Sequence, residues 1–154
     1  MEQDPYQVVP QLLGNLQENK MAKIDHLGIA VKSIEQARSF YEALGLAVLA
    51  DEREEEGVRS VMVPLGDSQL RLLQPVSSNT ELGKFLDQHG EGLHHLALHV
   101  DDISSTFEEM KQAGVKLLSD DIEIGAGGRL HFLVAPSAAN GVLLEICQDP
   151  IAAV

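Results

Sequence analysis

The chain has 154 residues, and 24 Asp and Glu against 11 Lys and Arg give a formal net charge of −13. This excess of acid argues against non-specific binding of DNA or RNA and against docking on an anionic membrane, since both need basic surfaces. With 44% hydrophobic and 23% charged residues, the composition is ordinary for one folded domain. We therefore expect a globular protein without a nucleic-acid or membrane partner.

The single cysteine, Cys147, excludes a disulfide within the chain and favours a reducing compartment. It lies in an apolar run without a basic neighbour in sequence, which predicts a buried, unreactive thiol. No run approaches the ~18 apolar residues of a membrane span, and the acidic N-terminus lacks the features of a signal peptide. The expected location is the cytoplasm.

Two related segments define the organisation of the chain. Residues 26–34 (HLGIAVKSI) and 95–103 (HLALHVDDI) share His, Leu, Val and Ile in register at an offset of 69 residues. We interpret residues 1–22 as an N-terminal extension and residues 23–151 as a single domain. That domain comprises module one (23–76), a linker with a helix (77–91) and module two (92–151).

Each module predicts the same order of elements. An alternating apolar stretch indicates a strand, and a polar N-cap residue (Ser33 or Asp102) precedes a helical pattern that ends before Gly45 or Gly114. Three further strands follow, so each module reads βαβββ and the fold class is α+β, with a curved sheet around a central cavity. The expected strands are 24–31, 46–52, 58–64 and 69–74 in module one and 93–100, 115–119, 129–135 and 142–147 in module two; the expected helices are 34–44, 80–89 and 103–113.

Four equivalent positions carry the candidate chemistry. His26 and His95 lie on the first strands of the two modules, and Arg71 and Glu145 lie on the last strands. If the two sheets pair about a pseudo-twofold axis, these side chains converge on one concave surface. A lone histidine in an apolar strand is usually a core residue, but a repeated pair beside a carboxylate favours a divalent-metal or acid–base site.

Five sequence motifs carry a resemblance to a known family. They are IDHLGIAV at 24–31, GEGLHHLA at 90–97, VDDI at 100–103, GGRLHF at 127–132 and GVLLEI at 141–146. The first resembles the vicinal oxygen chelate superfamily of glyoxalase I, extradiol dioxygenases and bleomycin-resistance proteins. Together they resemble methylmalonyl-CoA epimerases, across about residues 23–150.

The resemblance implies a metal-dependent isomerase that acts on an acyl-CoA substrate and forms a homodimer. A divalent ion, cobalt or another first-row metal, would be held by His26, His95 and Glu145. Glu145 would also be the catalytic base, with His94 and His131 as alternatives. Some relatives carry a further Glu on the third strand, where this chain has Ser60.

Arg71 occupies the position of the family's fourth metal ligand, four residues before Pro75. A guanidinium has no lone pair to give and would repel a cation. The metal could be held by three residues and water, Arg71 could form a salt bridge with Glu145, or Arg71 could bind a substrate carboxylate. A register slip would instead bring Gln69 or Gln74 into the site.

The leading hypothesis is therefore a methylmalonyl-CoA epimerase-like enzyme with Arg71 as a substrate-binding residue. The departures at Ser60 and Arg71 keep two alternatives open. One is another lyase or isomerase of the superfamily, and the other is a non-catalytic small-molecule-binding protein of the resistance type.

Overall fold

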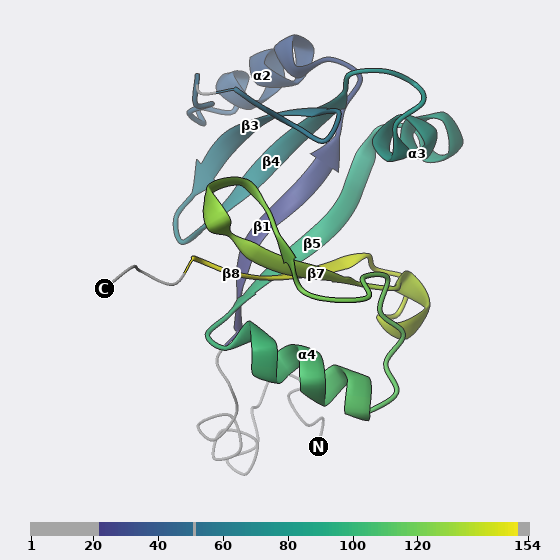
Figure 1. Ribbon diagram of the computed structural model, residues 1–154. Helices are drawn as coiled ribbons and strands as arrows, with labels where there is room; N and C mark the ends of the chain where they lie inside the picture. Colours follow the sequence, from purple (N-terminus) through teal and green to yellow (C-terminus); the bar gives the residue numbers. More distant parts are fainter. Residues whose placement is uncertain (1–21, 51, 151–154) are drawn as a thin grey trace, which may run out of the picture.

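The computed structural model describes residues 22–50 and 52–150 (Figure 1). The N-terminal extension expected over 1–22 lies outside these residues except for Ala22, where the first strand begins. No helix in the described ranges is long and apolar enough to cross a membrane.

The first half of the chain forms one helix and four strands, followed by the linker helix. These elements are β1 (Ala22–Ala30), α2 (Ile34–Ala43), β2 (Arg53–Glu55), β3 (Val58–Leu65), β4 (Ser68–Pro75) and α3 (Glu81–His89). The second half repeats the pattern. Its elements are β5 (Gly92–Val100), α4 (Ile103–Gln112), β6 (Glu123–Ile124), the short 3₁₀ turn η1 (Ala126–Gly128), β7 (Leu130–Val134), the short 3₁₀ turn η2 (Pro136–Ala138) and β8 (Leu144–Gln148).

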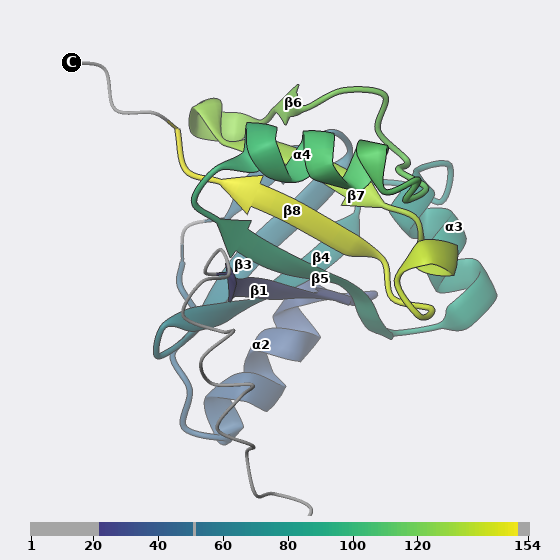
Figure 2. The same ribbon diagram turned by 90° about the horizontal axis from the view of Figure 1, so that it is seen from below.

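The eight strands form a single curled sheet in the order β2-β3-β4-β1-β5-β8-β7-β6. In each module the first strand pairs in parallel with the last, and the last pairs antiparallel with the third. The antiparallel pair β1–β5 joins the modules at the centre of the sheet (Figures 1 and 2). The structure thus has the α+β fold of two βαβββ modules predicted from the repeat.

Local sequence signals fix the ends of the helices. The side-chain oxygens of Ser33 and Asp102 accept hydrogen bonds from the first turns of α2 and α4, as the N-cap prediction requires. Gly45 and Gly114 follow the last turns with φ of 85° and 75°, a conformation that glycine adopts without a steric penalty. The helix predicted at 80–89 forms with Thr80 as its N-cap.

The strands predicted at 46–52 and 115–119 are wrong. The described residues of the first segment are irregular, although the Leu49 N–H donates to the Met62 carbonyl at 2.9 Å. The second forms one isolated bridge, between Leu117 and Val134. The second strand of each module comes later instead, as the short β2 and β6.

Three apolar clusters stabilise the fold. The first packs α2 against β1, β3 and β4, with Ile34, Val63 and Leu72 almost completely buried. The second packs α4 against β7 and β8 around Phe132 and Ile103 (Figure 2). The third places α3 against one end of the opposite sheet face, and its buried members are Ala30, Leu73, Leu82 and Leu86. The rest of that opposite face carries the polar side chains of the candidate site.

Candidate metal centre

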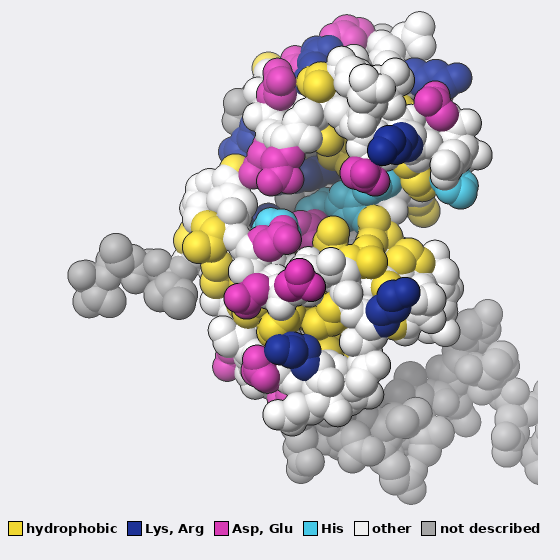
Figure 3. Space-filling model, turned by 45° about the vertical axis from the view of Figure 1, so that its right-hand side comes forward, with side chains coloured by type: hydrophobic (Ala, Val, Ile, Leu, Met, Phe, Trp, Pro, Cys, Tyr) yellow, Lys and Arg dark blue, Asp and Glu magenta, His cyan; other side chains and the backbone are white. Residues whose placement is uncertain are grey.

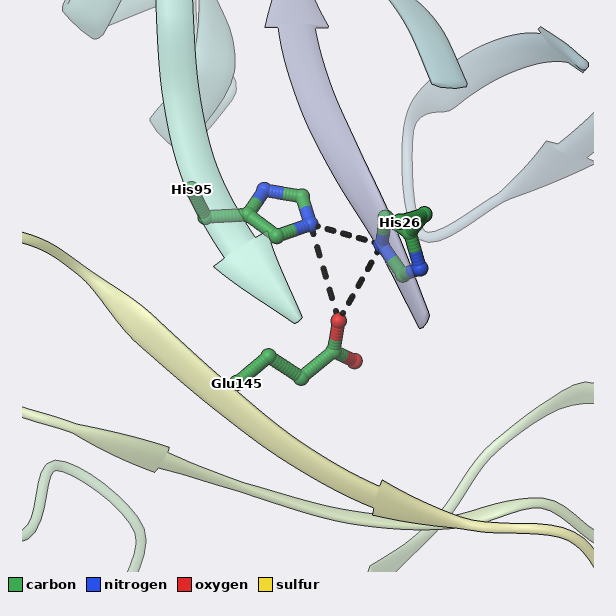
Figure 4. Close-up of side chains that lie close together, drawn as sticks. All are labelled: His26, His95 and Glu145. Atoms are coloured by element: carbon green, nitrogen blue, oxygen red, sulfur yellow. Dashed lines mark hydrogen bonds and ion pairs between the residues drawn. The ribbon is translucent and has the colours of Figure 1, made fainter. Parts of the chain in front are cut away.

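His26, His95 and Glu145 meet at the centre of the sheet (Figure 4). The two histidine Nε2 atoms lie 2.9 Å apart. Oε2 of Glu145 lies 3.4 Å from Nε2 of His26 and 3.5 Å from Nε2 of His95. The structure thus brings together the three residues that the sequence analysis selected as candidate ligands.

The space-filling view shows histidine side chains at the floor of a cleft between the two halves of the molecule (Figure 3). His26 is buried with 5% of its surface exposed, and the Glu145 side chain is 21% exposed. The cluster is therefore largely removed from bulk water, and the Nε2 atoms of both histidines face the Glu145 carboxylate at the cleft floor.

Strand pairing explains why the two rings converge. In the register of β1 and β5, His26 lies opposite Ala97, and His95 lies opposite Gly28. Each ring therefore lies over a small residue of the neighbouring strand. A Cβ added to Gly28 would come within 2.3 Å of Cε1 of His95, so this position accommodates the ring only as glycine.

A β-bulge precedes each histidine. The register shifts between Ile24 and His26 on β1, which leaves Asp25 as an extra residue, and His94 is the extra residue on β5. A bulge turns two consecutive side chains toward one face of the sheet, and the neighbour of each ligand thereby reaches its ring. Nδ1 of His26 donates to Oδ2 of Asp25 at 2.6 Å, and Nδ1 of His95 lies 2.9 Å from Nδ1 of His94.

Asp25 is held as a carboxylate by its partners. Burial raises its pKa, but hydrogen bonds from His26 and Arg129 outweigh burial and bring the pKa well below its usual range. A carboxylate that accepts from Nδ1 fixes the ring of His26 so that Nε2 faces the cluster, the arrangement typical of metal-binding histidines. Neither Asp25 nor Arg129 is among the site residues expected from the sequence, because regular alternation places Asp25 on the opposite face.

The two histidines differ in their electrostatics. Burial lowers the pKa of His95 to about 4, so this ring is neutral near pH 7. Burial also lowers the pKa of His26, but the hydrogen bonds with Asp25 and Glu145 outweigh it and the net shift is upward. Burial lowers the pKa of His94 as well, which makes its contact with His95 one between two neutral rings.

The two oxygens of Glu145 face different partners. Oε2 faces the two histidines, whereas Oε1 lies 3.8 Å from Nδ1 of His131 on β7. Burial raises the pKa of Glu145, but the hydrogen bond with His26 and the nearby histidines lower it overall. Nδ1 of His131 is buried and makes no hydrogen bond. His131 therefore joins the edge of the cluster.

The donor set fits a divalent metal ion. Ligands bound at about 2.0–2.1 Å with angles of about 90–109° are separated by about 2.8–3.4 Å, close to the spacings observed here. Two imidazoles and one carboxylate are the ligand types that first-row metals share, and the hydrogen bonds of Asp25 and His94 support the rings from behind. The chain therefore presents three potential ligands to a divalent ion.

The surroundings of Arg71 do not support a role as a metal ligand. No salt bridge joins it to Glu145 within the described residues, and its Nε is buried without a hydrogen-bond partner. Burial and the charge of Arg129 lower its pKa, while Asp25 and Glu145 raise it. The side chain lines a cavity of about 90 Å³ together with Leu49, Arg53, Ser60, Val61 and Met62.

No register slip replaces Arg71. The pairing of β3 with β4 is regular, with Met62 opposite Arg71. Gln74, considered as a substitute ligand, accepts from the Ile34 N–H at 2.9 Å and thus supports the start of α2. Gln69 pairs with Pro64 near the far end of the strand.

Cys147 is buried, as the sequence predicts. The absence of a basic neighbour holds only along the sequence, since Nη2 of Arg129 lies 3.2 Å from the sulfur. Burial nevertheless dominates over the arginine and raises the pKa of the thiol to about 12. The thiol is therefore protonated at neutral pH and lacks the thiolate needed for reactivity.

Comparison with known proteins identifies the class of fold and site. Residues 25–132 match the model of the Glyoxalase/Bleomycin resistance protein/Dioxygenase superfamily. An uncharacterised protein of Bacillus subtilis, YqjC, is 38% identical over 130 residues, which cover 83% of this chain and 93% of the relative. The mitochondrial methylmalonyl-CoA epimerase of Mus musculus is 35% identical over 132 residues, covering 84% of this chain and 74% of the relative.

Solved structures agree with the sequence comparison. The methylmalonyl-CoA epimerase of Streptomyces coelicolor, solved in complex with 2-nitronate-propionyl-CoA, has a TM-score of 0.75 and 30% identity. The match covers 84% of this chain and 98% of that chain. The present chain therefore belongs to the Glyoxalase/Bleomycin resistance protein/Dioxygenase superfamily and, within it, to the family that includes the methylmalonyl-CoA epimerases.

Proposed function

We propose that the protein is a methylmalonyl-CoA epimerase-like isomerase that inverts the α-carbon of a methylmalonyl-type thioester. The observation that carries the proposal is the cluster of His26, His95 and Glu145, whose ligand atoms lie within 4.8 Å of one another at the cleft floor. The names of its relatives, 31–35% identical to this chain, support the same reaction at the level of the family.

Epimerisation needs proton removal on one face of the α-carbon and proton return on the other. The electrons of the broken C–H bond move toward the thioester carbonyl, so negative charge develops on its oxygen and must be stabilised. A divalent ion held by His26, His95 and Glu145 would supply that stabilisation as a Lewis acid. Cobalt or another first-row ion suits this ligand set.

Glu145 is the proposed catalytic base as well as a ligand. Its lowered pKa keeps it ionised at neutral pH, and its two oxygens face different groups. Oε2 is therefore free to serve the metal site while Oε1 accepts the substrate proton. Because Ser60 cannot act as a base, the second proton-transfer group must come from elsewhere.

His131, one of the two histidines considered for that second role, lies too close to Glu145 to serve the opposite face of the α-carbon. Its Nδ1 makes no hydrogen bond and lies 3.8 Å from Oε1 of Glu145. Nδ1 of His94 is already engaged with His95. Two groups that each approach one carbon at about 3 Å from opposite faces lie about 6 Å apart, so His131 and Oε1 of Glu145 do not form such a pair. We therefore assign His94 a supporting role behind the cluster and leave the second proton transfer without an assigned residue.

The departures at Ser60 and Arg71 favour one alternative, a different lyase or isomerase reaction of the superfamily at the same metal site. The other alternative, a non-catalytic binding protein, would be supported most strongly by a salt bridge in which Arg71 neutralises Glu145. The absence of an Arg71–Glu145 salt bridge within the described residues weighs against that version. A panel of superfamily substrates, combined with elemental analysis for bound metal, distinguishes the three functions.

The decisive experiment is proton exchange at the substrate. The Co²⁺-loaded protein is incubated with one epimer of methylmalonyl-CoA in deuterated water, and loss of the α-proton signal is followed by NMR. We expect exchange well above the protein-free rate, its loss in Glu145→Gln, and no change in the control Glu81→Gln, which alters an exposed side chain on α3. Exchange at the protein-free rate with metal bound would overturn the proposal.

Two expectations from the resemblance accompany this function. The homodimer and the cytoplasmic location stay predictions, which light scattering and cell fractionation can check. The acyl-CoA substrate is taken from the relatives, one of which was solved with methylmalonyl-CoA itself.

A further inference from the structure

Arg71 is a half-buried cation whose Nε is a buried and unsatisfied donor. Its Nε is shielded from water and has no hydrogen-bond partner, although a guanidinium carries five donors that need acceptors. Leaving a buried donor of a charged group unpaired is unfavourable, and such groups usually have a functional explanation. A bound acceptor would resolve the deficit.

The space beside Arg71 fits a small acceptor. The cavity that it lines measures about 90 Å³, far below the ~300–1,000 Å³ typical of a site for a whole ligand. Arg71, Ser60 and Met62 face this cavity from β3 and β4, whose pairing sets Met62 opposite Arg71 and Ser60 two residues further along. The cavity, which Arg53 also lines, thus combines guanidinium groups and a hydroxyl with an apolar wall.

The balance of charge also calls for an anion. Neither nearby carboxylate pairs with Arg71, because Asp25 forms an ion pair with Arg129 and Glu145 faces His26, His95 and His131. A divalent ion at the cluster would add two positive charges close to Arg71. A negatively charged group bound between the ion and Arg71 would restore the balance.

We infer that Arg71 and Ser60 form a carboxylate subsite, which holds the free carboxylate of the substrate while the thioester lies toward His26, His95 and Glu145. The planar guanidinium donates two parallel hydrogen bonds to a carboxylate, and the Ser60 hydroxyl donates a third. Position 71, where the resemblance implies a metal ligand, would thereby bind the anion instead of the cation. The identity of the substrate rests on the proposed function, but the subsite can be tested without it.

Malonate, a small dicarboxylate, is the probe. Its binding to the full chain, freed of metal by chelation, is measured by isothermal titration calorimetry. We expect Arg71→Met to weaken malonate binding at least about tenfold, as loss of a charge-assisted hydrogen bond implies, and Arg71→Lys to weaken it less. Ser60→Ala should weaken it by a smaller factor. Arg59→Met is the matched control, because Arg59 pairs with Glu35 and Glu52 outside the cavity.

Each outcome decides the inference. Malonate binding that depends on Arg71 and exceeds binding of inorganic phosphate supports the carboxylate subsite. No malonate binding, binding that survives both Arg71 variants, or a preference for phosphate overturns it. The exchange experiment is independent of this test. Arg71-dependent malonate binding without α-proton exchange would keep the subsite and reject the epimerase. α-Proton exchange without Arg71-dependent malonate binding would keep the epimerase and reject the subsite.

Discussion

His26 and His95 occupy equivalent positions in the two modules, and each is supported by the residue before it. The partner is a carboxylate, Asp25, in module one and a neutral imidazole, His94, in module two. Both partners reach their histidine because a β-bulge turns them to the same face of the sheet. The repeated βαβββ unit therefore presents a nearly symmetric pair of candidate ligands, with supports of unequal strength.

The outer strands of the modules diverge more. The pairs Ser60–Leu73 and His131–Cys147 are equivalent in the two registers, so Ser60 corresponds to His131 and Arg71 to Glu145. Module two thus brings a carboxylate and an imidazole to the cleft, whereas module one brings a guanidinium and a hydroxyl. If both proposals hold, the symmetric fold carries a divided site, with cation ligation shared at the centre and anion binding confined to module one.

The pairing of β1 with β5 is the feature most sensitive to substitution. In Gly28→Ala the new Cβ would lie 2.3 Å from the His95 ring, which must then move off the strand. Because loss of a supporting residue alone costs about 10–100-fold in metal affinity, loss of a ligand should cost at least about 100-fold. Overpacking should also lower the free energy of unfolding by about 1–3 kcal/mol.

Titration calorimetry with Co²⁺ and thermal unfolding check this expectation. Lys23→Ala, an exposed substitution on the same strand, is the control and should change neither quantity. Unchanged Co²⁺ affinity in a folded Gly28→Ala variant would show that His95 is not held over Gly28 when metal binds.

Asp25→Asn tests the stronger of the two supports. The substitution removes a charge-assisted hydrogen bond to His26 and leaves Arg129 without its anionic partner. We expect Co²⁺ affinity to fall toward the upper end of the 10–100-fold range. Asp101→Asn, at an exposed site, provides the control. An effect no larger than that of the control would mean that Asp25 supports the fold rather than the ligand.

Much of this arrangement follows from the sequence alone. The repeat and the period-two alternation place His26, His95 and Glu145 on one face, because those side chains lie on regular stretches of their strands. The alternation fails for Asp25 and His94, since a bulge shifts the period by one residue and leaves no signal in a single sequence. Arg129 contacts Asp25 although the two residues are 104 positions apart in sequence, and only the folded, curled sheet brings them together.

The two wrong strands have a different cause. Leu46 and Val48 pack against the cluster under α2, and Val115 and Leu117 pack against the cluster under α4. Their apolar pattern therefore reflects contact with helices and sheet. Few main-chain hydrogen bonds accompany it, because each segment follows the edge of the sheet without a continuous ladder. Burial and strand pairing give the same pattern in sequence and cannot be separated there.

His94→Leu tests the weaker support and closes the comparison of the modules. Its bond to His95 joins two neutral rings at 2.9 Å, and such bonds are about half as strong as those with an ionised partner. We expect Co²⁺ affinity to fall about tenfold, the lower end of the range for supporting residues, and His94→Gln to restore part of it through its amide. Equal losses of Co²⁺ affinity for His94→Leu and Asp25→Asn would contradict the unequal supports, because the charge on Asp25 is the physical difference between them.

Thermal unfolding separates this effect from packing, since His94 also contacts the ring of Phe85 on α3. A drop in stability that His94→Gln does not relieve, with metal affinity unchanged, would assign His94 to the packing of α3 instead.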